Sequence, residues 1–163
     1  MLKMTIVYYS KTGNTKEMAE TIAKGANTVE GVAAKAFPLD GIDADWIKES
    51  RAVIAGTPIY MASVCGELKS WLEGPAFQYG LAGKLGGAFA TADYIHGGGD
   101  LGIRTVLDHM LVAGMLTYSG GGSLGKPYIH LGPVAISGKL DESRETFEIY
   151  GKRMAEKSKE LWG

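Results

Sequence analysis

Two hydrophobic periodicities alternate along the chain, and they predict strands that alternate with helices. Short apolar runs without regular polar alternation are typical of strands buried on both faces, and they occur at residues 4–9, 32–39, 51–57 and 86–91. Between these runs, apolar residues recur at helical spacing, as at Met18 and Ile22. We expect one helix to begin at Asn14 or Thr15, and others to span residues 43–49, 65–73, 101–113 and 141–161.

The apolar positions also predict which side of each later helix is buried. In the helix over residues 101–113 they form one stripe: Ile103, Leu107, Met110 and Leu111. In the last helix the positions expected to face the sheet are Phe147, Gly151, Met154, Ser158 and Leu161.

The C-terminal third predicts an interrupted strand. A fifth strand begins at residues 115–118, a glycine-rich segment at 120–126 interrupts it, and strand-like sequence resumes over 128–136. Strands that alternate with helices imply a parallel sheet covered on both faces. We therefore expect one α/β domain over residues 1–163, with three α/β/α layers and strand order 2-1-3-4-5. Ligands of such sheets bind beyond the carboxyl ends of the strands, so loops 10–15, 57–64 and 91–100 should share one rim.

Composition narrows the class of protein. The chain has 163 residues, of which 45% are hydrophobic, and this suits a single core. A net charge of −1 provides no basic field for nucleic acid or an anionic membrane surface. No apolar run approaches the roughly 20 residues that cross a bilayer, and residues 1–9 are too short for a signal peptide, so we expect a cytoplasmic protein. The one cysteine, Cys65, excludes an internal disulfide, and the three histidines are too dispersed to predict a metal site.

The strongest chemical signal is the loop between the first strand and the first helix. Its sequence is Ser10-Lys11-Thr12-Gly13-Asn14-Thr15. A helix start offers unpaired N–H groups and partial positive charge, three hydroxyls can donate to phosphate oxygens, and glycine lets the backbone approach closely. This pattern predicts a phosphate monoester site, although the same residue types also make ordinary helix caps. The Gly-Lys-Ser/Thr of a nucleotide triphosphatase loop is absent, which disfavours ATP hydrolysis.

Two further segments are expected on the same rim. Pro58, Ile59, Tyr60, Met61, Ala62 and Ser63 offer a rigid turn and an aromatic ring that could cover a flat ligand or simply cover the core. Thr91, Ala92, Asp93, Tyr94, Ile95, His96, Gly97 and Gly98 add a second aromatic, a titratable imidazole and glycine backbone.

Together these segments resemble a known family. The Ser-x-Thr-Gly-Asn-Thr loop resembles the flavin mononucleotide (FMN) phosphate loop of flavodoxins. The later segments resemble the WrbA-type NAD(P)H:quinone oxidoreductases at 56–58 (Gly-Thr-Pro), 65–68 (Cys-Gly-Glu-Leu), 83–85 (Gly-Lys-Leu), 96–98 (His-Gly-Gly), 114–115 (Gly-Met) and 125–128 (Gly-Lys-Pro-Tyr). Where those reductases commonly carry Arg-Phe-Gly-Asn, this chain has Tyr60-Met61-Ala62-Ser63.

The resemblance implies a flavodoxin-like fold and an FMN site. Ser10, Lys11 through its backbone, Thr12, Gly13, Asn14 and Thr15 would hold the phosphate. Residues 58–63 and 91–98 would flank the isoalloxazine on two sides, with His96 near the reacting face as the candidate catalytic residue.

Three functions follow from this resemblance. The first is an oxidoreductase that takes electrons from NAD(P)H and passes them to a quinone-like small molecule, in a protein that assembles as a dimer or tetramer. The second is a flavodoxin-type carrier that serves redox partner proteins, although such carriers are usually more acidic than this chain. The third is an FMN-binding protein without turnover.

Three other motif matches lack the context their chemistry needs. Residues 97–102 fit Gly-x-Gly-x-x-Gly but lie outside a first βαβ unit. Residues 121–125 resemble a hydrolase nucleophile elbow, but Pro127 follows where that motif requires a helix. Residues 120–126 resemble the start of a Walker loop, but Pro127 stands where that motif requires a metal-binding hydroxyl.

Cys65 is expected to behave as a small buried hydrophobe, with a redox-sensitive thiol at a helix start as the alternative.

Overall fold

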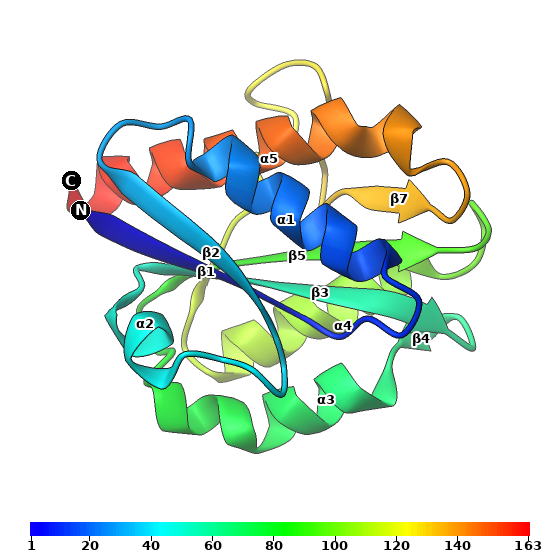
Figure 1. Cartoon of the computed structure of the whole chain (residues 1–163), viewed down its shortest axis with the longest axis horizontal. Coiled ribbons are helices and arrows are strands. Elements are labelled where there is room, and N and C mark those ends of the chain that lie inside the picture. The colour runs from blue at the N-terminus through cyan, green and yellow to red at the C-terminus, as the bar shows by residue number, and fades with distance from the viewer.

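A parallel sheet with helices on both faces organises the chain, and the computed structural model describes all 163 residues (Figure 1). The strands are β1 (Leu2–Tyr8), β2 (Val32–Pro38), β3 (Ala52–Tyr60), β4 (Ser63–Val64), β5 (Leu85–Ala92), β6 (Leu116–Thr117) and β7 (Val134–Ile136). The helices are α1 (Asn14–Ala26), α2 (Ala44–Glu49), α3 (Gly66–Glu73), the short 3-10 helix η1 (Pro75–Tyr79), α4 (Gly99–Val112) and α5 (Leu140–Trp162).

The sheet has the expected doubly wound order. Its path is β2-β1-β3-β5-β6, and every pairing along it is parallel. Strand β7 also pairs with β5 in parallel, further along, so β6 and β7 are the two halves of one interrupted fifth strand. The prediction of order 2-1-3-4-5 with a break in the last strand is confirmed; β4 adds a short antiparallel pairing with the end of β3.

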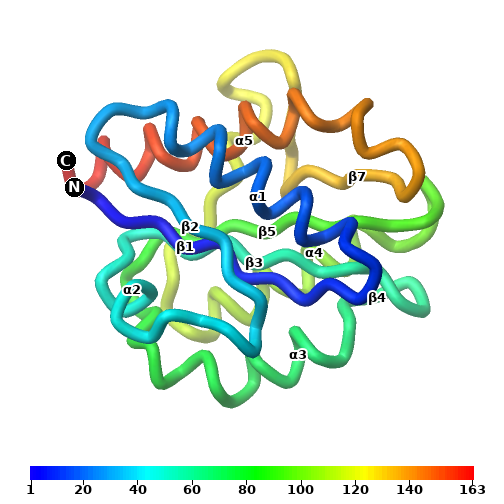
Figure 2. Tube along the Cα trace, in the orientation of Figure 1, coloured from blue at the N-terminus to red at the C-terminus, as the bar shows by residue number.

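Two hydrophobic cores lie on opposite faces of the sheet. One contains Met18 and Ile22 of α1 and Phe147 and Met154 of α5, and Figure 2 shows these two helices side by side above the strands. The other is built from α2, α3 and α4. The central strands β3 and β5 are buried on both faces over almost their whole length, which explains their continuous apolar sequence.

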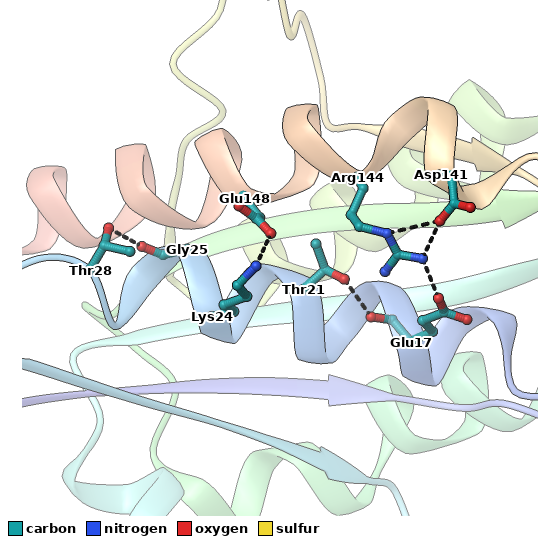
Figure 3. A network of polar contacts seen from close by, with 8 residues as sticks. All are labelled: Glu17, Thr21, Lys24, Gly25, Thr28, Asp141, Arg144 and Glu148. Atoms are coloured by element: carbon teal, nitrogen blue, oxygen red, sulfur yellow. Dashed lines mark hydrogen bonds and ion pairs between the residues drawn. The ribbon is translucent and has the colours of Figure 1, made fainter.

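Helices α1 and α5 cross at two glycines. A Cβ at Gly25 would lie 1.9 Å from the Glu148 carbonyl oxygen, and one at Gly151 would lie 2.0 Å from the Ile22 carbonyl oxygen. Side-chain contacts then line the seam, as Figure 3 shows: Lys24 pairs with Glu148 at 2.6 Å, and Arg144 bridges Glu17 of α1 at 2.5 Å. This close crossing fixes α1, whose N-terminus lies at the rim where the candidate site was predicted.

The structure corrects several details of the sequence analysis. Strand β3 continues three residues past Thr57 and turns into β4, so residues 58–64 form a hairpin rather than an irregular loop. Within 128–136 only 134–136 are strand, because Gly132 lies against the Ala88 backbone carbonyl, where a Cβ would be 2.1 Å from its oxygen, and Pro133 has no N–H to donate.

The buried stripes differ as well. Leu111 and Leu161 are exposed, and Leu107 is only half-buried. Val106 completes the buried face of α4 with Ile103 and Met110, and Gly151 faces α1 rather than the sheet. None of the helices combines the length and apolar character required to span a membrane.

Candidate functional site

A cleft of about 410 Å³ opens at the carboxyl ends of the central strands. All three predicted loops contribute to it, and so does the residue that follows β7. The lining residues are Ser10, Lys11, Thr12, Asn14, Thr15, Pro58, Ile59, Tyr60, Thr91, Ala92, Asp93 and Ser137. The cleft therefore lies at the switch point of the sheet, on the expected rim.

The floor of this cleft is the uncapped N-terminus of α1. Gly13 precedes the helix with a φ of 99°, and no side chain caps it. The backbone N–H groups of Asn14, Thr15 and Lys16 have no acceptor within the chain. The hydroxyls of this loop thus do not serve as a helix cap. Free N–H groups, the partial positive charge of the helix start and the hydroxyls all suit an anion with several oxygen acceptors.

Hydrogen bonds from other strands hold the loop in place. The Thr15 hydroxyl lies 2.8 Å from that of Thr91, at the end of β5. The Asn14 amide donates to the Ser137 hydroxyl at 2.9 Å, just beyond β7. Ser137 was not among the predicted site residues, because the rim was expected at the first three loops only. Its position immediately after the last predicted strand, at a carboxyl end, was the available signal.

The hairpin between β3 and β4 forms one wall. Buried Thr57 accepts a hydrogen bond from the Cys65 N–H at 2.9 Å and donates to the Pro58 carbonyl at 2.7 Å, which closes the base of the hairpin. Tyr60 lines the cleft and is 41% exposed. Partial burial, followed by the charges of neighbouring ionisable groups, raises the pKa of its phenol above the ordinary value.

Several predicted residues stand outside this cleft. Gly13 lies in the loop but does not line it, while Met61, Ala62 and Ser63 form the exposed tip of the hairpin. Gly98 packs beneath that tip, since a Cβ there would lie 2.3 Å from the Ala62 carbonyl oxygen. Tyr94 and Gly97 belong to the loop between β5 and α4, and the Tyr94 side chain is 74% exposed.

The candidate catalytic residue His96 is also separate from the cleft. It is exposed and lines a second depression with Ile95 and residues at the start of α4.

Cys65 is buried, and burial raises the pKa of its thiol, which favours the unreactive protonated form. His109 lies in α4 and bonds the Thr105 carbonyl at 2.7 Å. No group of three or more His, Cys, Asp or Glu side chains is arranged to hold a metal.

Comparisons with known proteins agree with this geometry. The family model described as Flavodoxin matches residues 6–94. A protein named flavodoxin from Clostridium saccharobutylicum is 40% identical over 161 residues, which cover 99% of this chain and 100% of the relative. An NAD(P)H dehydrogenase (quinone) from Geobacter metallireducens is 28% identical, with 83% of this chain and 77% of the relative covered.

Solved structures show the same fold. A flavodoxin from the domain Archaea superposes with a TM-score of 0.79 at 23% identity, covering 97% of this chain and 99% of the other. A WrbA-like protein from Agrobacterium tumefaciens has a TM-score of 0.76 at 23% identity, covering 98% and 99%.

Proposed function

The chain belongs to the flavodoxin family, and from this premise we propose that it binds FMN in the cleft above α1 and moves electrons through it. The observation that carries the proposal is the uncapped start of α1. Its free N–H groups and the hydroxyls of Ser10, Thr12 and Thr15 form a cradle suited to a phosphate dianion.

We propose that the FMN contacts are the ones predicted from the sequence. Residues 10–15 would hold the phosphate, and residues 58–63 and 91–98 would lie along the two sides of the flavin ring, with residues 58–60 and 91–93 lining the cleft itself. The predicted place of His96 near the reacting face requires the ring to extend beyond the cleft, because His96 lines a separate depression. Bound FMN supplies the capacity to accept and release one electron or a hydride equivalent. The chain's own part is to bind and orient: Tyr60 offers a neutral aromatic wall, and the Thr15–Thr91 contact keeps the phosphate loop aligned with β5.

We propose electron transfer between redox partner proteins as the principal role. Support comes from the flavodoxin of Clostridium saccharobutylicum, which matches this chain from end to end at 40% identity. A carrier needs its cofactor near the surface, and the exposed hairpin tip beside the cleft is consistent with that.

A second candidate is reduction of a quinone-like acceptor at the expense of NAD(P)H. It is supported by the relatives named NAD(P)H dehydrogenase (quinone), and by the small exposed side chains Ala62 and Ser63, which leave room beside the cleft for a nicotinamide. In this case a dimer or tetramer would complete the site from a neighbouring chain.

Two measurements test these proposals. The purified protein should bind FMN at least about tenfold more tightly than riboflavin, which lacks the phosphate, and Thr12→Ala should narrow that gap. Failure of the folded protein to bind FMN would refute the cofactor assignment. Under anaerobic conditions, reduction only through a flavodoxin reductase supports the carrier, whereas direct bleaching of bound FMN by NADH or NADPH supports the oxidoreductase.

A further inference from the structure

A second groove adjoins the phosphate loop on its other side. It lies between the ends of β1 and β2 and the helices α3 and η1, and its volume is about 570 Å³. Figure 2 shows the trace that leaves β2 turning beside α3. Ser10 lines both this groove and the phosphate cleft, so the two are neighbours. We call it the aromatic groove, and its size falls within the range of small-molecule sites.

Aromatic side chains form its walls. Tyr8 and Tyr9 come from the end of β1, and Trp71 comes from α3. The faces of tyrosine and tryptophan rings attract cations through the ring quadrupole. The indole N–H of Trp71 is buried and has no acceptor within the chain. The aromatic wall suits a flat ring, and the ring quadrupoles favour one that carries positive charge. The Trp71 N–H itself calls for an acceptor atom rather than for a cation.

The charged residues of the groove are all acidic. Asp40 follows β2, Glu67 lies in the first turn of α3, and no lysine or arginine lines the groove. Neither carboxylate takes part in any ion pair of the chain. Partial burial, and after it the nearby Glu67 carboxylate, raises the pKa of the Tyr9 phenol.

The phosphate cleft differs in charge, because its lining balances Lys11 against Asp93 and a helix start there attracts anions. Two unpaired carboxylates beside three aromatic rings stabilise a cation and repel an anion. Pro38, Leu39 and Pro75 complete an apolar lining that a flat body would cover.

We propose that the aromatic groove is a binding site for an organic cation with a flat aromatic body. The assignment rests on the groove's own residues and does not depend on FMN binding in the neighbouring cleft.

The probe for this proposal is 1-methylquinolinium, with neutral quinoline at pH 8 and anionic naphthalene-2-sulfonate for comparison. Titrations followed by ¹H–¹⁵N NMR use the full-length protein. The Trp71 indole signal, identified with Trp71→Phe, should shift with 1-methylquinolinium, together with the amides of Glu67 and Ser70. The signals of Trp46 and Trp162 should stay in place, and so should the Asn14 and Thr15 amides of the other cleft.

The expected affinity for 1-methylquinolinium is at least about tenfold higher than for quinoline, and the sulfonate should not bind. The double variant Asp40→Asn/Glu67→Gln should lose most of that preference while still binding quinoline. Glu142→Gln/Glu145→Gln removes the same charge from exposed positions on α5 and should leave the affinity unchanged. Equal affinity for cation and neutral ring, shifts confined to residues 10–15, or an unaffected Asp40/Glu67 variant would each overturn the proposal.

Discussion

The hydroxyl oxygens of Thr15 and Thr91 lie 2.8 Å apart, and both residues are almost fully buried. One belongs to the first turn of α1 and the other to the end of β5, so this contact joins two of the segments that line the cleft of the candidate site. A buried hydroxyl that loses its partner pays a desolvation penalty, whereas removal of both hydroxyls leaves no unpaired group.

We therefore expect Thr15→Val and Thr91→Val each to lower the free energy of unfolding by about 1–3 kcal/mol. The double variant should lose clearly less than the sum of the two. Urea denaturation of the four proteins in a double-mutant cycle measures the coupling. Strictly additive losses would mean that the two hydroxyls do not interact. FMN affinity should fall more for Thr15→Val, because that hydroxyl lies in the phosphate loop.

The tight crossing of α1 and α5 leads to a second prediction. Gly151→Ala would place a Cβ against the Ile22 carbonyl oxygen, so the helices must separate. Although alanine favours a helix by about 1 kcal/mol over glycine, overpacking against rigid backbone costs more, and we expect a net loss of about 1–3 kcal/mol. Thermal or urea unfolding measures this change.

Gly66→Ala is the matched control, since Gly66 begins α3 and a Cβ there meets nothing within 4 Å. This variant should be neutral or slightly stabilised. If Gly151→Ala were equally well tolerated, the crossing would not require glycine. Because α5 holds α1 in place, we also expect Gly151→Ala, but not Gly66→Ala, to weaken FMN binding.

A third prediction concerns the fully buried Tyr150. Its hydroxyl lies over Gly87 and makes no hydrogen bond of normal geometry. Burial raises the pKa of the phenol far above its usual value of 10.0, and the nearby Ala88 backbone offsets only part of that rise. Above pH 10 the unfolded chain ionises this tyrosine while the folded protein keeps it protonated. The folded state then binds more protons, so stability falls as pH rises, by about 1.4 kcal/mol per pH unit.

Tyr150→Phe should remove this contribution. At pH 7 its free energy of unfolding should equal that of the wild type or exceed it by up to about 1 kcal/mol, because an unpaired buried group is lost. Between pH 10 and pH 11 the free energy of unfolding of the variant should exceed that of the wild type by a growing margin. Tyr128→Phe, at an exposed position, should follow the wild type throughout. Parallel pH profiles for Tyr150→Phe and the wild type would contradict the prediction.

The order of the elements and the cleft at residues 10–15 were accessible from sequence because both depend on local patterns. Strands buried on both faces show continuous apolar runs. The loop at residues 10–15 shows small and hydroxyl residues directly between the first such strand, β1, and the first helix, α1. The break in the fifth strand was visible for the same reason, since glycine and proline cluster there.

What escaped prediction depends on contacts between distant segments. Ser137 reaches Asn14 only because β7 pairs with the far half of β5. Leu111 has the right spacing for the buried stripe of α4, but it lies on the side that no other element covers. Residues 128–131 have strand-like composition, yet Ile129 makes only an isolated bridge with Gly121. The Arg153 guanidinium of α5 binds the carbonyl oxygens of residues 124–127 just before them.

The hairpin tip supplies the last prediction. Met61 and Ala62 form a two-residue turn with φ values of 51° and 62°, and this left-handed geometry is normally occupied by Asn and Gly. An L-residue with a side chain is destabilised by about 1–2 kcal/mol there, while glycine costs about 0.5–1 kcal/mol in lost chain entropy. Ala62→Gly should therefore raise the free energy of unfolding by about 0.5–1 kcal/mol. In the exposed first turn of α2, Ala44→Gly should instead lower it by a similar amount. Urea denaturation of both variants measures whether the free energy of unfolding rises in Ala62→Gly and falls in Ala44→Gly. A loss of stability in Ala62→Gly would show that the turn is not strained.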